Sequence, residues 1–138
     1  MIRVLSAVLR PLPAGRVTCP ADGAALLMAE MSHLQQEQLR VICLDILKRV
    51  QTIHTVYQGQ LSAVESRTIE LFREAFRRNS AAIILVHNHP SGDLLVTRQA
   101  VIVGKLLDVE VLDHLIIGRG HWVSLREKFP QKFATWKT

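Results

Sequence analysis

The sequence predicts a single α/β (α+β) domain in which helices flank a mixed central sheet. Its 138 residues, 49% of them hydrophobic, are enough for one ordinary core but too few for two comfortable domains. Residues 81–87, AAIILVH, are apolar without alternation, which is typical of a strand buried on both faces at the centre of a sheet. Segments with helical spacing alternate with strand-like segments, and this order favours helices packed around one sheet.

The first element is predicted to be a helix in TCPADGAALLMAEM, after an N-terminal arm or linker remnant at residues 1–16. Pro20 suits the first helical position because its missing N–H would be unpaired there anyway, and Asp22 faces the positive end of the helix dipole. Three apolar residues of this helix are expected to be buried: Leu26, Met28 and Met31.

A hairpin and a second helix should follow. The β-rich run at 40–46 and the run at 50–59 are predicted to pair across a turn at Lys48 and Arg49. Ser66 can cap a helix that runs through Phe76. Three residues at helical spacing, Ile69, Phe72 and Phe76, are its expected core positions, and Arg67, Arg73, Arg77 and Arg78 are expected to form a solvated face.

The remaining third of the chain predicts a helix and a second hairpin. Apolar residues at helical spacing, Val96, Ala100, Val103 and Leu107, indicate the helix. Residues 109–118 and 121–125 are predicted to pair across Arg119 and Gly120. The domain is therefore expected to span residues 17–127, with a basic C-terminal tail at 128–138.

Charge, cysteine content and hydrophobic runs limit the partners and the cellular location that can be expected. Seventeen Lys and Arg against twelve Asp and Glu give a net charge of +5, which favours acidic partners but is weak support for nucleic acid. Cys19 and Cys43 lie far apart and suggest neither a zinc knuckle nor a disulfide framework, so a cytoplasmic location fits best. The opening apolar run, cut by Pro11 and Pro13, is too short for a membrane span. No oligomeric state can be predicted.

Two histidines end the buried run. His87 and His89 are two residues apart, and in a strand such residues project to the same side, so both imidazoles could bind one metal ion. Pro90, Ser91 and Gly92 then break the strand, which leaves the pair at a sheet edge where loops and substrates meet.

The stretch AAIILVHNHPSGD resembles the RadC family, bacterial members of the JAB/MPN (JAMM-type) metalloprotease-like domains. The similarity continues in collinear order through PADGAALLMAEMSHLQQEQLRVICLD, LFREAFRRNSAAIILVHNHPSGD and TRQAVIVGKLLDVEVLDHLIIGRGHWVSLRE. The resemblance implies a JAB/MPN-like domain with cytidine deaminase-like architecture, a zinc cofactor, and hydrolysis of an amide in a peptide or protein substrate. The family also has a historical label as a DNA-repair family, so the resemblance raises an association with DNA repair.

The resemblance places the two metal histidines of the family on His87 and His89. The general-base glutamate of the family precedes a hairpin glycine, and counting back from Gly59 reaches His54 instead of a glutamate. A histidine could accept a proton or become a third nitrogen ligand, since its unperturbed pKa lies near neutrality. His54 is therefore the candidate catalytic residue, and an ordinary strand histidine is the other interpretation.

The third ligand of the family, an aspartate after HPSGD, has no obvious counterpart. One alignment puts Thr97 on the preceding family serine and Ala100 on the aspartate. We prefer the other, which aligns residues 97–114 without gaps and places a deletion of roughly two helical turns between Asp93 and Leu94. The deletion could be real, or a loop could be missing from the recorded sequence. Asp93 is the nearest substitute ligand.

Five other residues are expected to shape the site. Pro90, Ser91 and Gly92 form the turn after the histidines, Gly59 permits close approach of the backbone, and Asp113 is expected to bond loop amides. Two functions compete with a zinc hydrolase: an inactive JAB scaffold that binds a protein partner, and a DNA-binding module. Residues 1–16 are too few for the DNA-binding region that family members often carry.

Overall fold

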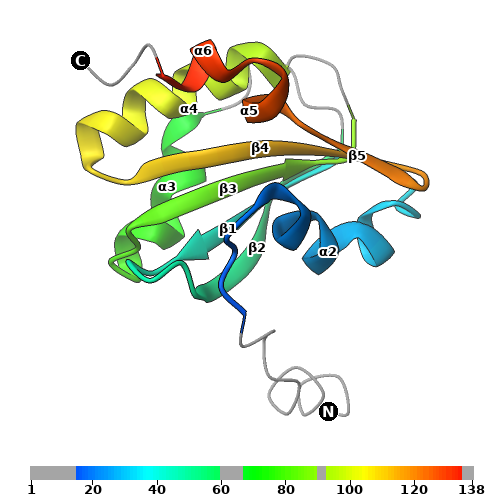
Figure 1. Cartoon of the computed structure of the whole chain (residues 1–138), viewed down its shortest axis with the longest axis horizontal. Coiled ribbons are helices and arrows are strands. Elements are labelled where there is room, and N and C mark those ends of the chain that lie inside the picture. The colour runs from blue at the N-terminus through cyan, green and yellow to red at the C-terminus, as the bar shows by residue number, and fades with distance from the viewer. Residues whose placement is uncertain (1–14, 60–66, 90–92, 135–138) are drawn as a thin grey trace.

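The computed structural model describes residues 15–59, 67–89 and 93–134, and Figure 1 shows them arranged around one twisted sheet. The sheet has five strands in the order β2-β1-β3-β4-β5. The strands are β1 (Gln38–Leu44), β2 (Val50–Gln58), β3 (Ala82–His87), β4 (Glu110–Gly118) and β5 (His121–Ser124). Only β3 and β4 are parallel, so the sheet is mixed, as predicted.

Strand β3 lies at the centre of the sheet, between β1 and β4, and all of its residues except His87 are apolar. All six positions of Ala82–His87 are buried, as expected for a strand covered on both faces. Helix α4 (Asp93–Leu107) connects β3 to the parallel strand β4, which is the usual crossover between parallel neighbours.

Helices cover both faces of the sheet (Figure 1). Helix α2 (Pro20–Met31) packs against β4 and β5 on one face, where Leu27, Met31 and Ile84 belong to one core cluster. Helices α3 (Thr68–Arg77) and α4 cover the other face, where Phe72 and Leu85 belong to the second cluster.

The two hairpins form as predicted. Asp45 holds the β1–β2 turn by accepting hydrogen bonds from the amides of Leu47 and Arg49, both at 2.9 Å, and Lys48 adopts a positive φ of 64°. Gly120, with φ at 73°, closes the β4–β5 turn, where a residue without Cβ adopts this backbone conformation at little cost.

The expected buried residues of two helices were partly wrong. In α2 the buried residues are Gly23, Ala24, Leu27 and Met31, whereas Leu26 and Met28 are only partly buried. In α3 Phe72 is buried as expected, but Ile69 and Phe76 are 56% and 61% exposed, and Leu71 and Ala75 fill the core instead. Ser66, the expected cap, lies outside the described residues, and Arg67 occupies the N-cap position.

The chain beyond β5 folds back on the sheet. Two short helices, α5 (Leu125–Lys128) and α6 (Pro130–Ala134), pack near β4, and the side chains of Leu125 and Phe133 are buried in the α3–α4 core. Phe133, in the segment predicted as a basic tail, thus contributes to this core. None of the helices in the described ranges is long and apolar enough to cross a membrane.

Candidate functional site

The two histidines lie at the carboxyl end of β3 in different environments. His87 is the last residue of the strand and is 1% exposed, whereas the side chain of His89 is 48% exposed. Their ring centroids are 6.4 Å apart with an interplanar angle of 60°. Because the strand ends at His87, the backbone bend at Asn88, and not strand alternation, determines where His89 lies.

Glu37 is the carboxylate that meets both imidazoles. Its Oε1 lies 3.2 Å from Nδ1 of His89, and its Oε2 lies 3.7 Å from Nε2 of His87. Oε2 is buried and has no hydrogen-bond partner within the described residues. A buried carboxylate oxygen facing an imidazole nitrogen at this distance is suited to share a proton or to flank a cation.

Asn88 fixes the segment that carries Glu37. Its Oδ1 accepts a hydrogen bond from the amide of Gln38 at 2.7 Å, and its Nδ2 donates to the carbonyl of Gln36 at 3.0 Å. The two bonds fall on either side of Glu37. Gly59, with φ at 93°, donates its amide to the carbonyl of Glu37 itself at 2.8 Å, so this predicted residue lies beside the site.

Neither Glu37 nor Asn88 was among the residues predicted from the sequence. Strand β1 pairs antiparallel with β3, and Leu39 is opposite His87. The start of β1 therefore lies at the end of β3. Glu37 immediately precedes β1, so the antiparallel register that pairs Leu39 with His87 is what brings Glu37 to the histidines.

His54 lies on β2, which β1 separates from β3. It pairs with Val41 of β1, and the charged side chains that act on its pKa are Glu74 and Arg78. Burial lowers the pKa of His54 below its usual 6.5, the carboxylate of Glu74 opposes that shift, and the guanidinium of Arg78 adds to it. Val41 in turn pairs with Leu85 of β3, so one strand lies between His54 and the strand that carries His87.

The third ligand is not settled by the described side chains. Pro90, Ser91 and Gly92 lie outside the described residues, as does the side chain of Asp93, whose backbone begins α4. Thr97 and Ala100, the alternative counterparts of the family serine and aspartate, are buried. Within residues 15–59, 67–89 and 93–134, no group of three His, Cys, Asp or Glu side chains is arranged to hold a metal ion.

Asp113 connects β4 to the elements that follow it. Its Oδ1 accepts hydrogen bonds from the amides of His114 at 2.7 Å and Arg126 at 3.1 Å, and its Oδ2 accepts one from the Ser124 hydroxyl at 2.6 Å. Its neighbour His114 is fully buried, lies 2.6 Å from the Thr97 hydroxyl through Nδ1, and has its ring centroid 6.4 Å from that of His87. Asp113 therefore supports the strands near the site without reaching the histidines.

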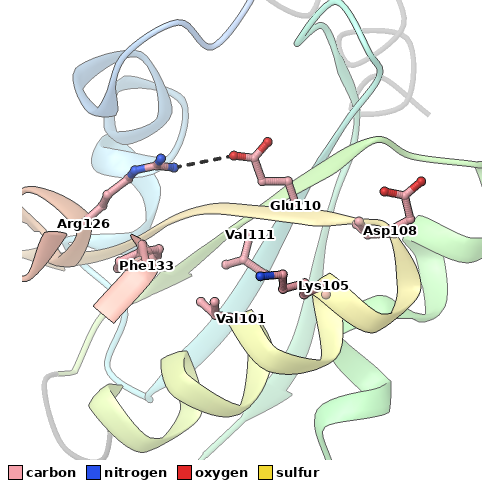
Figure 2. A pocket seen from close by; sticks show the side chains of 9 residues that line it. Val101, Lys105, Asp108, Glu110, Val111, Arg126 and Phe133 are labelled. Carbon is pink, nitrogen blue, oxygen red and sulfur yellow. Dashed lines mark ion pairs between the residues drawn. The ribbon is translucent and has the colours of Figure 1, made fainter. Parts of the chain in front are cut away.

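A separate cavity of about 380 Å³ opens between α4, the start of β4 and α6 (Figure 2). Val101, Val111 and Phe133 form apolar walls, and Arg126 faces Glu110 across the opening at 3.9 Å. Since β3 and β4 are parallel, the start of β4 lies at the opposite end of the sheet from His87. The cavity is thus not part of the histidine site.

Known proteins match this chain over most of its length. The family described as "RadC-like JAB domain" matches residues 17–130. A UPF0758 protein of Chloroflexus aggregans is 61% identical over 119 residues, covering 81% of this chain and 52% of the relative. A UPF0758 protein of Moorella thermoacetica is 44% identical over 116 residues, covering 79% of this chain and 51% of the relative. The chain spans about half the length of these curated relatives.

The coverage also bears on the length of the segment that follows the histidines. The Chloroflexus aggregans match runs over 119 positions, but 81% of 138 residues is about 112, so about seven aligned positions have no counterpart in this chain. A deletion of roughly two helical turns between Asp93 and Leu94 would account for a difference of this size. The extent of the family match and the identity to these relatives show that the chain belongs to the RadC-like JAB domain family.

Proposed function

We propose that this chain is a zinc-dependent hydrolase of peptide or isopeptide bonds, with His87 and His89 as metal ligands and Glu37 as the general base. The observation that carries the proposal is the carboxylate of Glu37 beside both imidazoles, at 3.2 Å and 3.7 Å. Two imidazoles can hold a metal ion and a carboxylate beside them can accept a proton, which are two of the functions that metal-assisted hydrolysis uses.

The residues present fit zinc in part. Imidazole nitrogen is a preferred zinc ligand, and catalytic zinc sites combine three protein ligands with an open position. His87 and His89 supply two nitrogens, and the buried Oε2 of Glu37 supplies negative charge next to them. The proposed third ligand is Asp93, whose backbone position at the start of α4 follows the histidine loop directly.

When bound, zinc supplies a Lewis acid that polarises an amide carbonyl and lowers the pKa of water. In the proposal, Oε2 of Glu37 accepts a proton from the attacking water and returns it to the leaving nitrogen. Asn88 and Gly59 hold Glu37 in place for both transfers through the bonds at 2.7, 3.0 and 2.8 Å. The bends after His87 leave His89 half-exposed, which keeps one side of the site open to substrate.

An inactive JAB scaffold is the second candidate. It is favoured by the seven or so aligned positions that the chain lacks and by the absence of a three-residue metal group from its described portion. Two protein ligands hold zinc poorly unless another side chain contributes. In that case the domain would keep its fold and bind a protein partner without turnover.

Hydrolysis of a synthetic peptide library, read by mass spectrometry, separates the two candidates. The hydrolase predicts cleavage that a chelator abolishes, that added zinc restores and that Glu37→Gln removes while zinc remains bound. Gln58→Glu places a new carboxyl group on the neighbouring strand end and serves as the control that should leave cleavage intact. The absence of both bound zinc and cleavage would favour the scaffold, whereas stoichiometric zinc would count against it.

A further inference from the structure

Five large apolar side chains remain exposed on the helical layer that contains α3 and α4. Together they are called the apolar strip: Ile69 (56% exposed), Phe76 (61%), Leu95 (45%), Ile102 (37%) and Leu106 (81%). Monomeric domains rarely leave large apolar groups gathered on one surface unless that surface binds something. The site at His87 and Glu37 uses none of them.

The members of the apolar strip lie beside the contact between α3 and α4. On α3, Ile69 and Phe76 are three residues before and four after Phe72, whose ring would lie 3.3 Å from a Cβ placed on Gly104 of α4. Residues at these spacings share one side of a helix. Ile69 and Phe76 therefore lie on the flank of α3 that faces α4.

The exposed apolar residues of α4 likewise lie on the flank that faces α3. Gln99 accepts a hydrogen bond from Thr68 of α3 at 3.4 Å, which marks the flank of α4 that faces α3. Leu95, Ile102 and Leu106 are four residues before Gln99, three after it and seven after it, so they share that flank. The two sets of exposed side chains thus lie on the facing flanks of α3 and α4.

Basic side chains border the strip on both helices. Arg73 is between Ile69 and Phe76 at four and three residues, and Arg98 and Lys105 follow Leu95 and Ile102 by three residues each. All three are exposed. Arg73 pairs with Glu70 at 2.7 Å, and the side chain of Arg73 is 64% exposed against 26% for Glu70.

We propose that the apolar strip on α3 and α4 binds an amphipathic helix of a partner protein, which places apolar side chains on the strip and acidic side chains against the basic border. An amphipathic helix in a groove anchors through residues at i, i+3, i+4 and i+7. Acidic flanks complement the basic border and the net charge of +5. A second copy of this chain is disfavoured because it would set basic borders against each other.

The test uses the full chain and two synthetic helical peptides with the same leucine stripe, one flanked by glutamates and the other by lysines. Fluorescence anisotropy at low salt should show binding of the acidic peptide and at least ~10-fold weaker binding of the basic one, a ratio that corresponds to about 1.4 kcal/mol. Leu106→Asn and Lys105→Glu should each weaken the acidic peptide several-fold. Ile46→Asn is the matched control because Ile46, at 84% exposed, lies on the β1–β2 turn and not on α3 or α4, and it should change nothing.

Three results would overturn the proposal. The first is equal affinity for both peptides, or none for either. The second is a concentration-dependent dimer in sedimentation that Leu106→Asn dissociates, because the strip would then bind a second copy. The third is binding to vesicles of anionic lipid that depends on Leu106 while the acidic peptide fails to compete, because the surface would then be a membrane contact.

Discussion

Replacing Asn88 with alanine should loosen Glu37 without touching a proposed zinc ligand. The change removes two hydrogen bonds, from the Gln38 amide and to the Gln36 carbonyl. A part-buried donor that loses its acceptor costs about 1–3 kcal/mol, and the exposed Gln36 carbonyl can bond to water at little cost. We therefore expect a loss of about 1–3 kcal/mol in the free energy of unfolding.

Amide hydrogen exchange gives the most local measurement of this change. The Gln38 amide should exchange faster in Asn88→Ala by a factor of roughly 10 or more, since each 1.4 kcal/mol of local opening is tenfold. Asn88→Asp keeps an acceptor for Gln38 but loses the donor to Gln36, so Gln38 should stay protected. Gln58→Ala removes a side-chain bond to Gln36 on the exposed side of the same segment and is the control.

Unchanged protection of Gln38 in Asn88→Ala would refute the claim that Asn88 holds this segment. If the Asn88→Ala protein also cleaves peptides at the wild-type rate, the position of Glu37 does not depend on Asn88. Slower cleavage with unchanged zinc content would instead show that Asn88 acts on the general base and not on the ligands.

Three further predictions follow from the described contacts. Gly104→Ala should lower stability by about 1–3 kcal/mol in chemical denaturation, because its Cβ would lie 2.4 Å from the Val109 carbonyl. His54 has a pKa below 6.5, so the unfolded chain binds its proton first as pH falls; stability should decline below pH 6.5, and His54→Gln should reduce that decline in urea titrations. Iodoacetamide should label exposed Cys19 in the native protein and spare Cys43, whose burial raises its thiol pKa to about 11; equal labelling would contradict this.

The fold could be predicted where hydrophobic pattern and turn residues agree. Residues 81–87 read as a central strand because no polar residue interrupts them, and Gly120 marked the second hairpin. The buried face of α3 was harder, because Ile69 and Phe76 follow helical spacing as well as Leu71 and Ala75 do. Which apolar face packs depends on the neighbouring α4, and the sequence alone does not show that contact.

The histidines of the site were visible in the sequence, but their carboxylate neighbour was not identified. Counting back from Gly59 followed β2 and reached His54, whereas Glu37 comes from the start of β1 and meets His87 through antiparallel pairing. Register between strands far apart in sequence is a tertiary property.

Zinc content is the measurement that tests the proposed site most directly. After equilibrium dialysis against a zinc salt, elemental analysis should find about one zinc per chain in the wild type and in Glu37→Gln. The double variant His87→Ala, His89→Ala should retain almost none. A double variant of two exposed histidines, His33→Ala and His121→Ala, should keep its zinc. Zinc retained after both site histidines are removed would contradict the proposed site.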